Sequence, residues 1–137
     1  MAVEIITQHH LGEEITRYSP NTTCYGAYVY NPKTKRVRTI LSKITMMATG
    51  GIGTTYGNTT NPLIATGDGV AMVYRAKGSV AGMEFVQFHP TSLYNPNESP
   101  SFLITEALRG AGAILKDLEG KEFMQKYDER GSLAPRD

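Results

Sequence analysis

Glycine is concentrated in one part of this 137-residue chain, and that concentration most constrains how the chain folds. Six of its fourteen glycines lie between positions 50 and 69. A glycine has no Cβ, so a cluster of glycines marks a place where the backbone turns tightly or passes close to another group. The sequence therefore predicts a tightly turned loop over residues 50–69, with regular elements on both sides.

The residues before this loop have the pattern of a β-sheet. β-Branched and aromatic residues alternate with small or polar ones over residues 3–6 and 24–30, which is typical of strands. Residues 31–35 begin with Asn-Pro and are otherwise polar, so they predict a hairpin turn into a third strand over residues 37–41. We expect a β-meander, followed by a short strand over residues 43–48 that is buried on both faces.

The second part of the sequence predicts helices and one more strand. Residues 69–76 suit a short helix with Asp68 near its N-cap. Side chains over residues 83–89 would alternate between the two faces of a strand, so this segment predicts a strand with His89 as its last residue, before a proline. Residues 102–108 have helical spacing. Together with the meander, these elements predict an α+β chain.

Composition limits the class of function. With 14 basic and 13 acidic residues the formal net charge is +1, which leaves no broad basic surface for nucleic acid. The longest apolar stretches are far shorter than the roughly 18 residues of a membrane-spanning helix. A single cysteine, Cys24, allows neither an internal disulfide nor a cysteine-based metal site. We therefore expect a cytoplasmic protein with no metal, nucleic-acid or membrane partner.

The glycine loop is the first candidate site. Ala48-Thr49-Gly50 follows a predicted strand, and its backbone N–H groups can reach a phosphate or the edge of a cofactor. The spacing is not Gly-x-Gly-x-x-Gly, so a tight turn explains the glycines equally well. Asp68 can accept hydrogen bonds from the hydroxyls of a sugar or ribityl chain, or it can simply cap its helix.

A second group of residues suits a small dicarboxylate. Such a ligand needs two anion sites built from arginine, protonated histidine or hydroxyl donors. His89, Thr105 and Arg136 offer these groups, and Glu106 can pair with Arg109 three residues later. Taken singly, a histidine beside proline is more typical of a packed strand end, a terminal arginine is usually solvated, and the Glu106–Arg109 pair is equally a scaffold contact.

Six motifs follow one another in a fixed order. They are Ala48-Thr49-Gly50-Gly51, Asn58-Thr59-Thr60-Asn61-Pro62, Thr66-Gly67-Asp68-Gly69, Met83-Glu84-Phe85-Val86-Gln87-Phe88-His89-Pro90-Thr91, Thr105-Glu106-Ala107-Leu108-Arg109-Gly110 and Leu133-Ala134-Pro135-Arg136-Asp137. In this order they resemble the succinate dehydrogenase and fumarate reductase flavoprotein family. The His-Pro-Thr-x-Leu-Tyr-x-Pro run and the ending from Asp128 resemble most the branch that oxidises L-aspartate.

The resemblance implies a chain cut from a longer flavoprotein. Residues 1–56 would belong to the FAD-binding domain, and residues 57–137 to a capping domain that is incomplete at its C-terminal end. The implied α+β fold is thus a capping domain of the fumarate reductase flavoprotein type, with a β-meander and a strand of the FAD-binding domain. Other flavin-contacting segments of the family lie outside the chain, so the isolated chain is expected to bind little FAD and to be inactive.

The resemblance also implies roles for individual residues. Five residues match positions that contact FAD in the family: Ala2, Ala48, Thr49, Gly50 and Asp68. His89, Thr105 and Glu106 match positions of the substrate pocket, and Arg136 matches the catalytic arginine. Ala111 departs from the family, whose members usually have an acidic residue there.

The implied reaction is oxidation of L-aspartate to iminoaspartate. FAD would accept the hydride, and oxygen or fumarate would reoxidise the flavin. This is the first step of de novo NAD biosynthesis in bacteria, so a functional link to quinolinate synthase is also implied. Two alternatives stay open: a fragment of a succinate dehydrogenase or fumarate reductase flavoprotein subunit, which works with membrane partners, and a binding module without a redox role.

Overall fold

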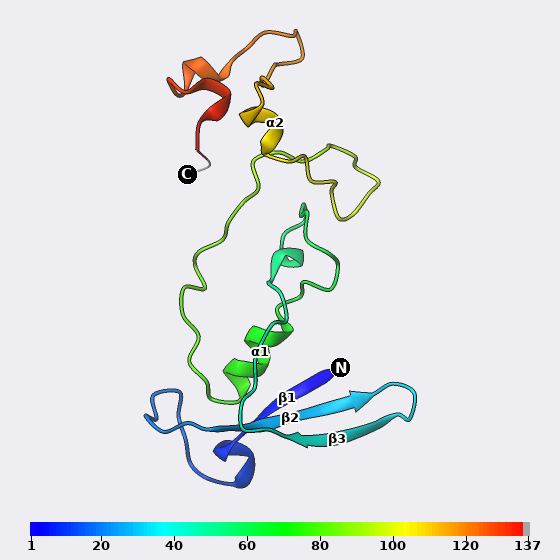
Figure 1. Cartoon of the computed structure of the whole chain (residues 1–137), viewed down its shortest axis with the longest axis vertical. Helices are drawn as coiled ribbons and strands as arrows, with labels where there is room; N and C mark the ends of the chain where they lie inside the picture. Colours follow the sequence, from blue (N-terminus) through cyan, green and yellow to red (C-terminus); the bar gives the residue numbers. More distant parts are fainter. Residues whose placement is uncertain (136–137) are drawn as a thin grey trace. The chain divides into compact units, whose positions relative to one another are not determined.

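The computed structural model describes residues 1–135 (Figure 1). Its strands are β1 (Ala2–Thr7), β2 (Cys24–Asn31) and β3 (Arg36–Leu41), and its α-helices are α1 (Asp68–Arg75) and α2 (Ala107–Gly110). Short 3-10 helices span Gln8–Leu11, Gly53–Thr55, Met124–Lys126 and Gly131–Leu133.

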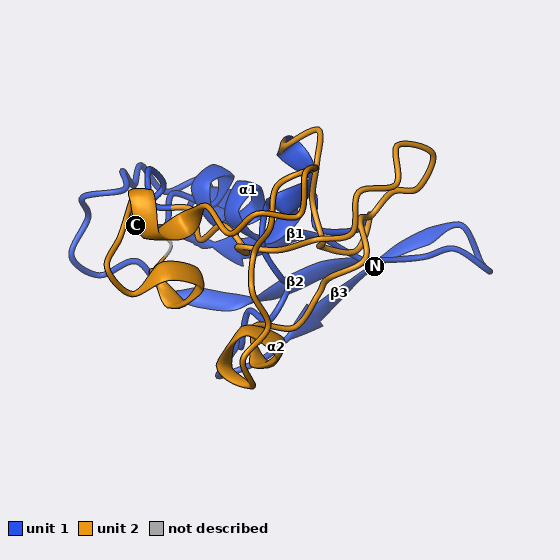
Figure 2. Cartoon of the chain, turned by 90° about the horizontal axis from the view of Figure 1, so that it is seen from above, with its two compact units in different colours: residues 1–55, 64–85 blue, residues 56–63, 86–137 orange. Residues whose placement is uncertain are grey.

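Internal contacts divide the chain into two compact units (Figure 2). Unit 1 comprises Met1–Thr55 and Ile64–Phe85, and unit 2 comprises Tyr56–Leu63 and the chain from Val86 onwards. The sheet and α1 lie in unit 1, and α2 lies in unit 2. The predicted division between an FAD-binding part (1–56) and a capping part (57–137) concerns domains of a longer protein and stays a prediction.

The predicted β-meander is confirmed. The three strands pair in the order β1-β2-β3, and both pairings are antiparallel. The hairpin turns where the Asn31 side chain accepts hydrogen bonds from the backbone N–H groups of Lys33 and Thr34, at 2.9 and 3.3 Å. Asparagine favours turns because its side chain replaces backbone hydrogen bonds in this way.

Helix α1 packs on β1 and forms the small core of unit 1. Ile5, Met72 and Ala76 make one buried cluster. The Thr7 hydroxyl donates to the Ala76 carbonyl at 2.9 Å, at the C-terminal end of the helix. Glu4 and Arg75 form a salt bridge of 2.6 Å on the outside of the same contact. The sheet thereby fixes the helix whose first residue is Asp68.

Three element predictions were wrong. Residues 43–48 and 83–89 are not strands, because no other segment of the described chain pairs with their backbone. The helix predicted over residues 102–108 is shorter, and α2 begins only at Ala107. In its place Leu103 forms a short antiparallel bridge with Ser92. Pairing with a distant segment satisfies these backbone groups and overrides local helix propensity.

Little of the described chain is buried. The buried hydrophobic residues of the described part are Ile5, Ile6, Ala65, Met72 and Ala76. Many large apolar side chains are exposed, among them Phe85 at 81% and Tyr94 at 88%. Apolar burial is the main stabilising term in folding, and in the described residues this term is small. Backbone hydrogen bonds and local turns therefore have an unusually large share in holding both units.

Gly26 provides a test of the sheet. It is buried in β2 at φ +139°, and a Cβ at this position would lie 2.0 Å from the Ile40 carbonyl oxygen in β3. In the full-length protein that carries this sequence, we expect Gly26→Ala to lower the free energy of unfolding by about 3 kcal/mol or more. The overlap of the new Cβ with the Ile40 carbonyl oxygen adds to the backbone strain of the positive φ. Thermal unfolding monitored by circular dichroism measures this loss.

Gly120→Ala is the matched control. Gly120 also has positive φ, +81°, but nothing lies within 4 Å of its Cβ position. Gly120→Ala should lower the free energy of unfolding only through backbone strain, by about 1 kcal/mol. Equal losses of stability for the two variants would show that β2 and β3 do not approach each other closely at Gly26.

Candidate functional site

The glycine-rich segment folds back on itself in unit 1. The Gly67 N–H donates to the Gly51 carbonyl at 3.1 Å. The Ala65 carbonyl accepts both from the Thr54 N–H at 3.1 Å and from the Thr54 hydroxyl at 2.7 Å. The start and the end of the predicted loop therefore lie side by side, directly before α1.

This loop brings Thr49 to the first turn of α1. A Cβ on Gly69 would lie 1.8 Å from the Thr49 hydroxyl oxygen, so only glycine leaves room for this approach. Asp68 is the first residue of α1 and is exposed, and it accepts a hydrogen bond from the Thr66 hydroxyl at 2.9 Å. The N-cap is Gly67, in the left-handed conformation, so Asp68 does not serve as the cap.

The loop also leaves an open backbone face. Nothing lies within 4 Å of the Cβ positions of Gly50 and Gly51, and both residues are exposed. Exposed backbone N–H groups can cradle a phosphate, and a neighbouring carboxylate can accept from hydroxyl groups. The arrangement of Gly50, Thr49 and Asp68 therefore fits a ligand that carries both phosphate and hydroxyl groups. Ala48 and Ala2 are exposed as well, Ala2 at the start of β1.

His89, in unit 2, is half-buried and fixed by the backbone of Thr91. Its Nδ1 lies 2.8 Å from the Thr91 carbonyl oxygen and 3.2 Å from the Thr91 nitrogen. Both contacts engage Nδ1, which donates to the carbonyl oxygen in one tautomer and accepts from the Thr91 N–H in the other. Nε2 is then the ring atom that can bind a ligand.

One carbonyl links His89 to the neighbourhood of Thr105. The bridge between Ser92 and Leu103 joins the segment after His89 to the segment before Thr105. The Ile104 N–H donates at 3.2 Å to the same Thr91 carbonyl that contacts the imidazole. The N–H of Ile104, the residue before Thr105, and the His89 ring therefore meet at one oxygen atom.

Thr105 and Glu106 directly precede α2. The Thr105 hydroxyl accepts from the Ala107 N–H at 3.3 Å, and its side chain is exposed. Glu106 and Arg109 form the predicted pair, with Oε1 and Nη2 3.4 Å apart. The Arg109 side chain is only 10% exposed, whereas that of Glu106 is 53% exposed. The arginine is thus the buried partner of the pair, and the glutamate is the exposed one.

Sequence reasoning missed some features of this region. The Thr91 hydroxyl and the Arg109 Nε are buried without a hydrogen-bond partner among the residues that the structure describes. A buried polar atom without a partner lowers the free energy of unfolding. Each of these two atoms is able to form one more hydrogen bond. Ser132, which bonds Arg109 and Leu115, was also missed. Nothing in the sequence pattern marks it. Arg136, the predicted catalytic residue, lies outside the described residues.

A charged turn precedes the Gly131–Leu133 helix. The Asp128 carboxylate accepts from Arg130 Nε and Nη2 at 3.0 and 2.9 Å and from its backbone N–H at 2.8 Å. These hydrogen bonds from Arg130 lower the pKa of Asp128 to about 2. The same contact raises the pKa of Arg130. The pair therefore stays ionised at neutral pH.

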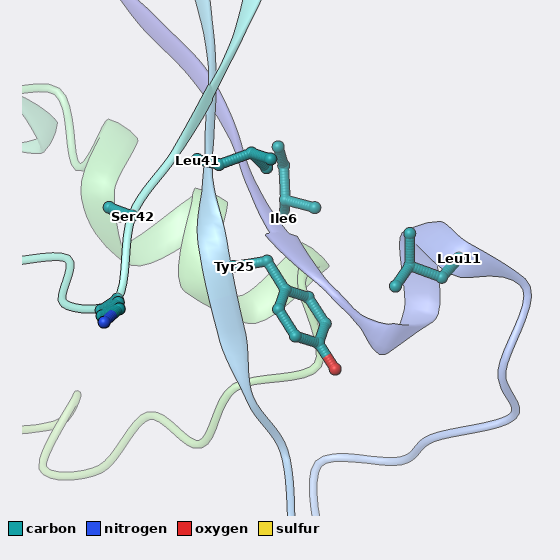
Figure 3. A pocket seen from close by; sticks show the side chains of 6 residues that line it. Ile6, Leu11, Tyr25, Leu41 and Ser42 are labelled. Carbon is teal, nitrogen blue, oxygen red and sulfur yellow. The ribbon is translucent and has the colours of Figure 1, made fainter.

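Other features of the described chain lie away from these residues. A mostly apolar pocket of about 550 Å³ in unit 1 is bordered by Ile6, Leu11 and Tyr25 together with the end of β3 (Figure 3). It includes none of the predicted site residues. Within residues 1–135, no three histidine, cysteine, aspartate or glutamate side chains are grouped so that they could hold a metal ion. Neither helix in this range is long and apolar enough to cross a membrane.

Comparisons with known proteins match the whole chain. The model of the FAD binding domain family matches residues 1–137. The L-aspartate oxidase of Acinetobacter baylyi is 49% identical over 137 residues, which are 100% of this chain and 24% of that protein. The chloroplastic L-aspartate oxidase of Arabidopsis thaliana is 46% identical over 142 residues, covering 96% of this chain and 22% of that protein.

The chain thus spans about a quarter of the length of the curated relatives it matches. The L-aspartate oxidase of Vibrio cholerae gives the same result, with 46% identity over 136 residues and 24% of its length covered. These matches confirm the resemblance predicted from the ordered motifs. Because the family model covers every residue, the chain belongs to the FAD-binding domain family, among flavoproteins of the succinate dehydrogenase and fumarate reductase type.

Proposed function

We propose that the protein containing this chain is an FAD-dependent oxidase that converts L-aspartate to iminoaspartate. One observation carries the proposal: the Thr91 carbonyl contacts the His89 ring and accepts a hydrogen bond from the N–H of Ile104, the residue before Thr105. This contact joins two residues that the motifs assign to one dicarboxylate pocket. The matched relatives are named L-aspartate oxidases, which favours L-aspartate over succinate as the substrate.

In this proposal unit 1 contributes to the cofactor site. Thr49, Gly50 and Asp68 hold phosphate and hydroxyl groups of FAD, and Ala2 and Ala48 line its path. The open backbone at Gly50 and the exposed Asp68 carboxylate support these roles. When bound, FAD supplies the hydride acceptor, and oxygen or fumarate reoxidises it. The rest of the cofactor site comes from other parts of the protein.

The substrate residues act by binding and orientation. His89, through Nε2, and Thr105 hold one carboxylate, and Glu106 completes the pocket. Arg136 binds the other carboxylate, so that the Cα hydrogen of L-aspartate faces the flavin. A guanidinium is effectively never deprotonated, so Arg136 orients the substrate and stabilises charge rather than acting as a base. We assign residues 57–137 to a capping domain, whose closure would exclude water from the site.

The wider setting follows from the same proposal. Iminoaspartate formation would be the first step of de novo NAD biosynthesis, and quinolinate synthase would use the product. The single cysteine suits a reducing cytoplasm. Three of the matched relatives are described as chloroplastic, so the compartment can differ between members.

Replacement of Arg136 tests the reaction. In the FAD-loaded full-length protein, Arg136→Leu should lower L-aspartate oxidation by at least about 1000-fold, because the substrate loses both a carboxylate partner and its orientation. FAD content should stay unchanged. Peroxide release under air and the flavin absorbance of the purified protein measure the two quantities.

Arg38→Leu serves as the control, because it removes an exposed arginine from β3. Its activity should stay within about twofold of the wild type, as is usual for surface changes. Substantial activity of Arg136→Leu would refute the assigned role. A wild-type protein that carries FAD but releases no iminoaspartate would refute the proposed function.

The Thr49–Gly69 approach gives a test of the cofactor site. Gly69→Ala should push the Thr49 side chain away from α1 and weaken FAD binding about tenfold or more. Gly57→Ala, with nothing within 4 Å of its Cβ position, should leave the affinity unchanged. Quenching of flavin fluorescence on addition to the apoprotein measures both dissociation constants. Identical affinities would mean that this loop does not hold FAD.

The 137-residue chain by itself should bind FAD weakly or not at all and show no turnover, because it spans only about a quarter of its relatives. Equilibrium dialysis against FAD tests this expectation. A yellow preparation with one FAD per chain would contradict it.

A further inference from the structure

Thr66 and Asp68 lie on the outer side of the turn that leads into α1. Ala65 and Gly67 are buried, whereas Thr66 and Asp68 are exposed. The Thr66 hydroxyl donates to Asp68 Oδ1 at 2.9 Å, and the Ile64 carbonyl oxygen lies 3.3 Å from the same hydroxyl. A hydroxyl has one hydrogen, and a hydrogen bond to a carboxylate is stronger than one to a neutral oxygen. Thr66 therefore bonds chiefly to Asp68.

The backbone on both sides of Thr66 is fixed by the first part of the glycine-rich loop. Ala65, the residue before it, has a carbonyl that accepts from the Thr54 N–H at 3.1 Å and from the Thr54 hydroxyl at 2.7 Å. Gly67, the residue after it, donates its N–H to the Gly51 carbonyl at 3.1 Å. Thr66 thus stands between two anchored residues, and its hydroxyl has a defined position.

The Asp68 carboxylate keeps one oxygen atom for a ligand. Within residues 1–135, this carboxylate accepts the hydrogen bond from Thr66 and no other. An ionised carboxylate only accepts hydrogen bonds, so Oδ2 can bind a hydroxyl group but repels a phosphate. A side chain that is already held in one orientation loses less entropy when a ligand binds. Thr66 thereby prepares Asp68 for the hydroxyl groups of a ligand.

We propose that Thr66 is a positioning residue for FAD, because its hydroxyl orients the Asp68 carboxylate toward a hydroxyl group of the cofactor. The inference rests on the proposed function, in which Asp68 belongs to the FAD site. In that site the exposed backbone at Gly50 takes phosphate, and Asp68 takes the uncharged hydroxyl-bearing part of FAD. Thr66 gives its one hydrogen to Asp68 and needs no contact of its own with the cofactor.

Binding of FAD to the full-length apoprotein tests the inference, with quenching of flavin fluorescence as the readout. Thr66→Val removes the hydroxyl but nearly keeps the size of the side chain, and it should raise the dissociation constant about fivefold. In the Asp68→Ala background the same change should raise it less than about twofold, because no carboxylate is left to orient. Thr66→Ser keeps a hydroxyl and should bind FAD within about twofold of the wild type.

Thr39→Val is the matched control, because it removes the hydroxyl of an exposed threonine in β3. Its dissociation constant for FAD should stay within about twofold of the wild type. If circular dichroism shows that Thr66→Val does not fold, Thr66→Ala takes its place in the cycle.

Equal increases of the dissociation constant with and without the Asp68 carboxylate would show a merely structural role of Thr66 and overturn the inference. An unchanged dissociation constant for Thr66→Val or for Asp68→Ala would overturn it too. The same holds if Thr66→Ser binds as weakly as Thr66→Val, or if neither the valine nor the alanine variant folds.

The proposed function is tested separately, by turnover of L-aspartate in the wild type. The FAD-binding cycle needs no substrate, so a protein that gives the expected cycle but leaves L-aspartate unchanged would refute the oxidase proposal alone. Conversely, a wild type that oxidises L-aspartate while Thr66→Val binds FAD with full affinity would refute the role of Thr66 alone.

Discussion

The arrangement of unit 2 depends on the carbonyl oxygen of Thr91. This atom accepts from the Ile104 N–H and contacts the His89 ring, so one backbone group fixes both a side chain and the path of a distant segment. Backbone hydrogen bonds have this weight because little apolar surface is buried in the described chain. Arg109 connects two segments further along the chain, because its buried guanidinium donates hydrogen bonds to both the Ser132 carbonyl and the Glu106 carboxylate.

Features encoded by neighbouring residues could be predicted from the sequence. The meander follows from alternation and the Asn-Pro turn, and α1 follows from its local spacing. The glycine cluster correctly predicted a closely turned loop, because steric room at Gly69 is a property of the residue type. The pairing of Glu106 with Arg109 was also predictable, since it depends only on a separation of three residues.

Features that depend on distant partners could not be predicted. Alternation over residues 83–89 is the pattern of a strand, yet a strand needs a partner, and none lies in the described chain. Conversely, the pairing of Leu103 with Ser92 replaced an expected helix. The bond from Arg109 to Ser132 ends on a backbone oxygen, which carries no residue-specific signal. Arg136 was suggested by its residue type and by the ordered motifs, and it lies outside the described residues.

The exposed apolar side chains have a consequence for the fate of this polypeptide in a cell. Phe85, Tyr94 and Leu118 present the kind of surface that molecular chaperones and quality-control proteases recognise in incompletely folded proteins. Wherever this stretch stands without other polypeptide packed on it, during synthesis or after proteolytic cleavage, aggregation through these side chains competes with folding.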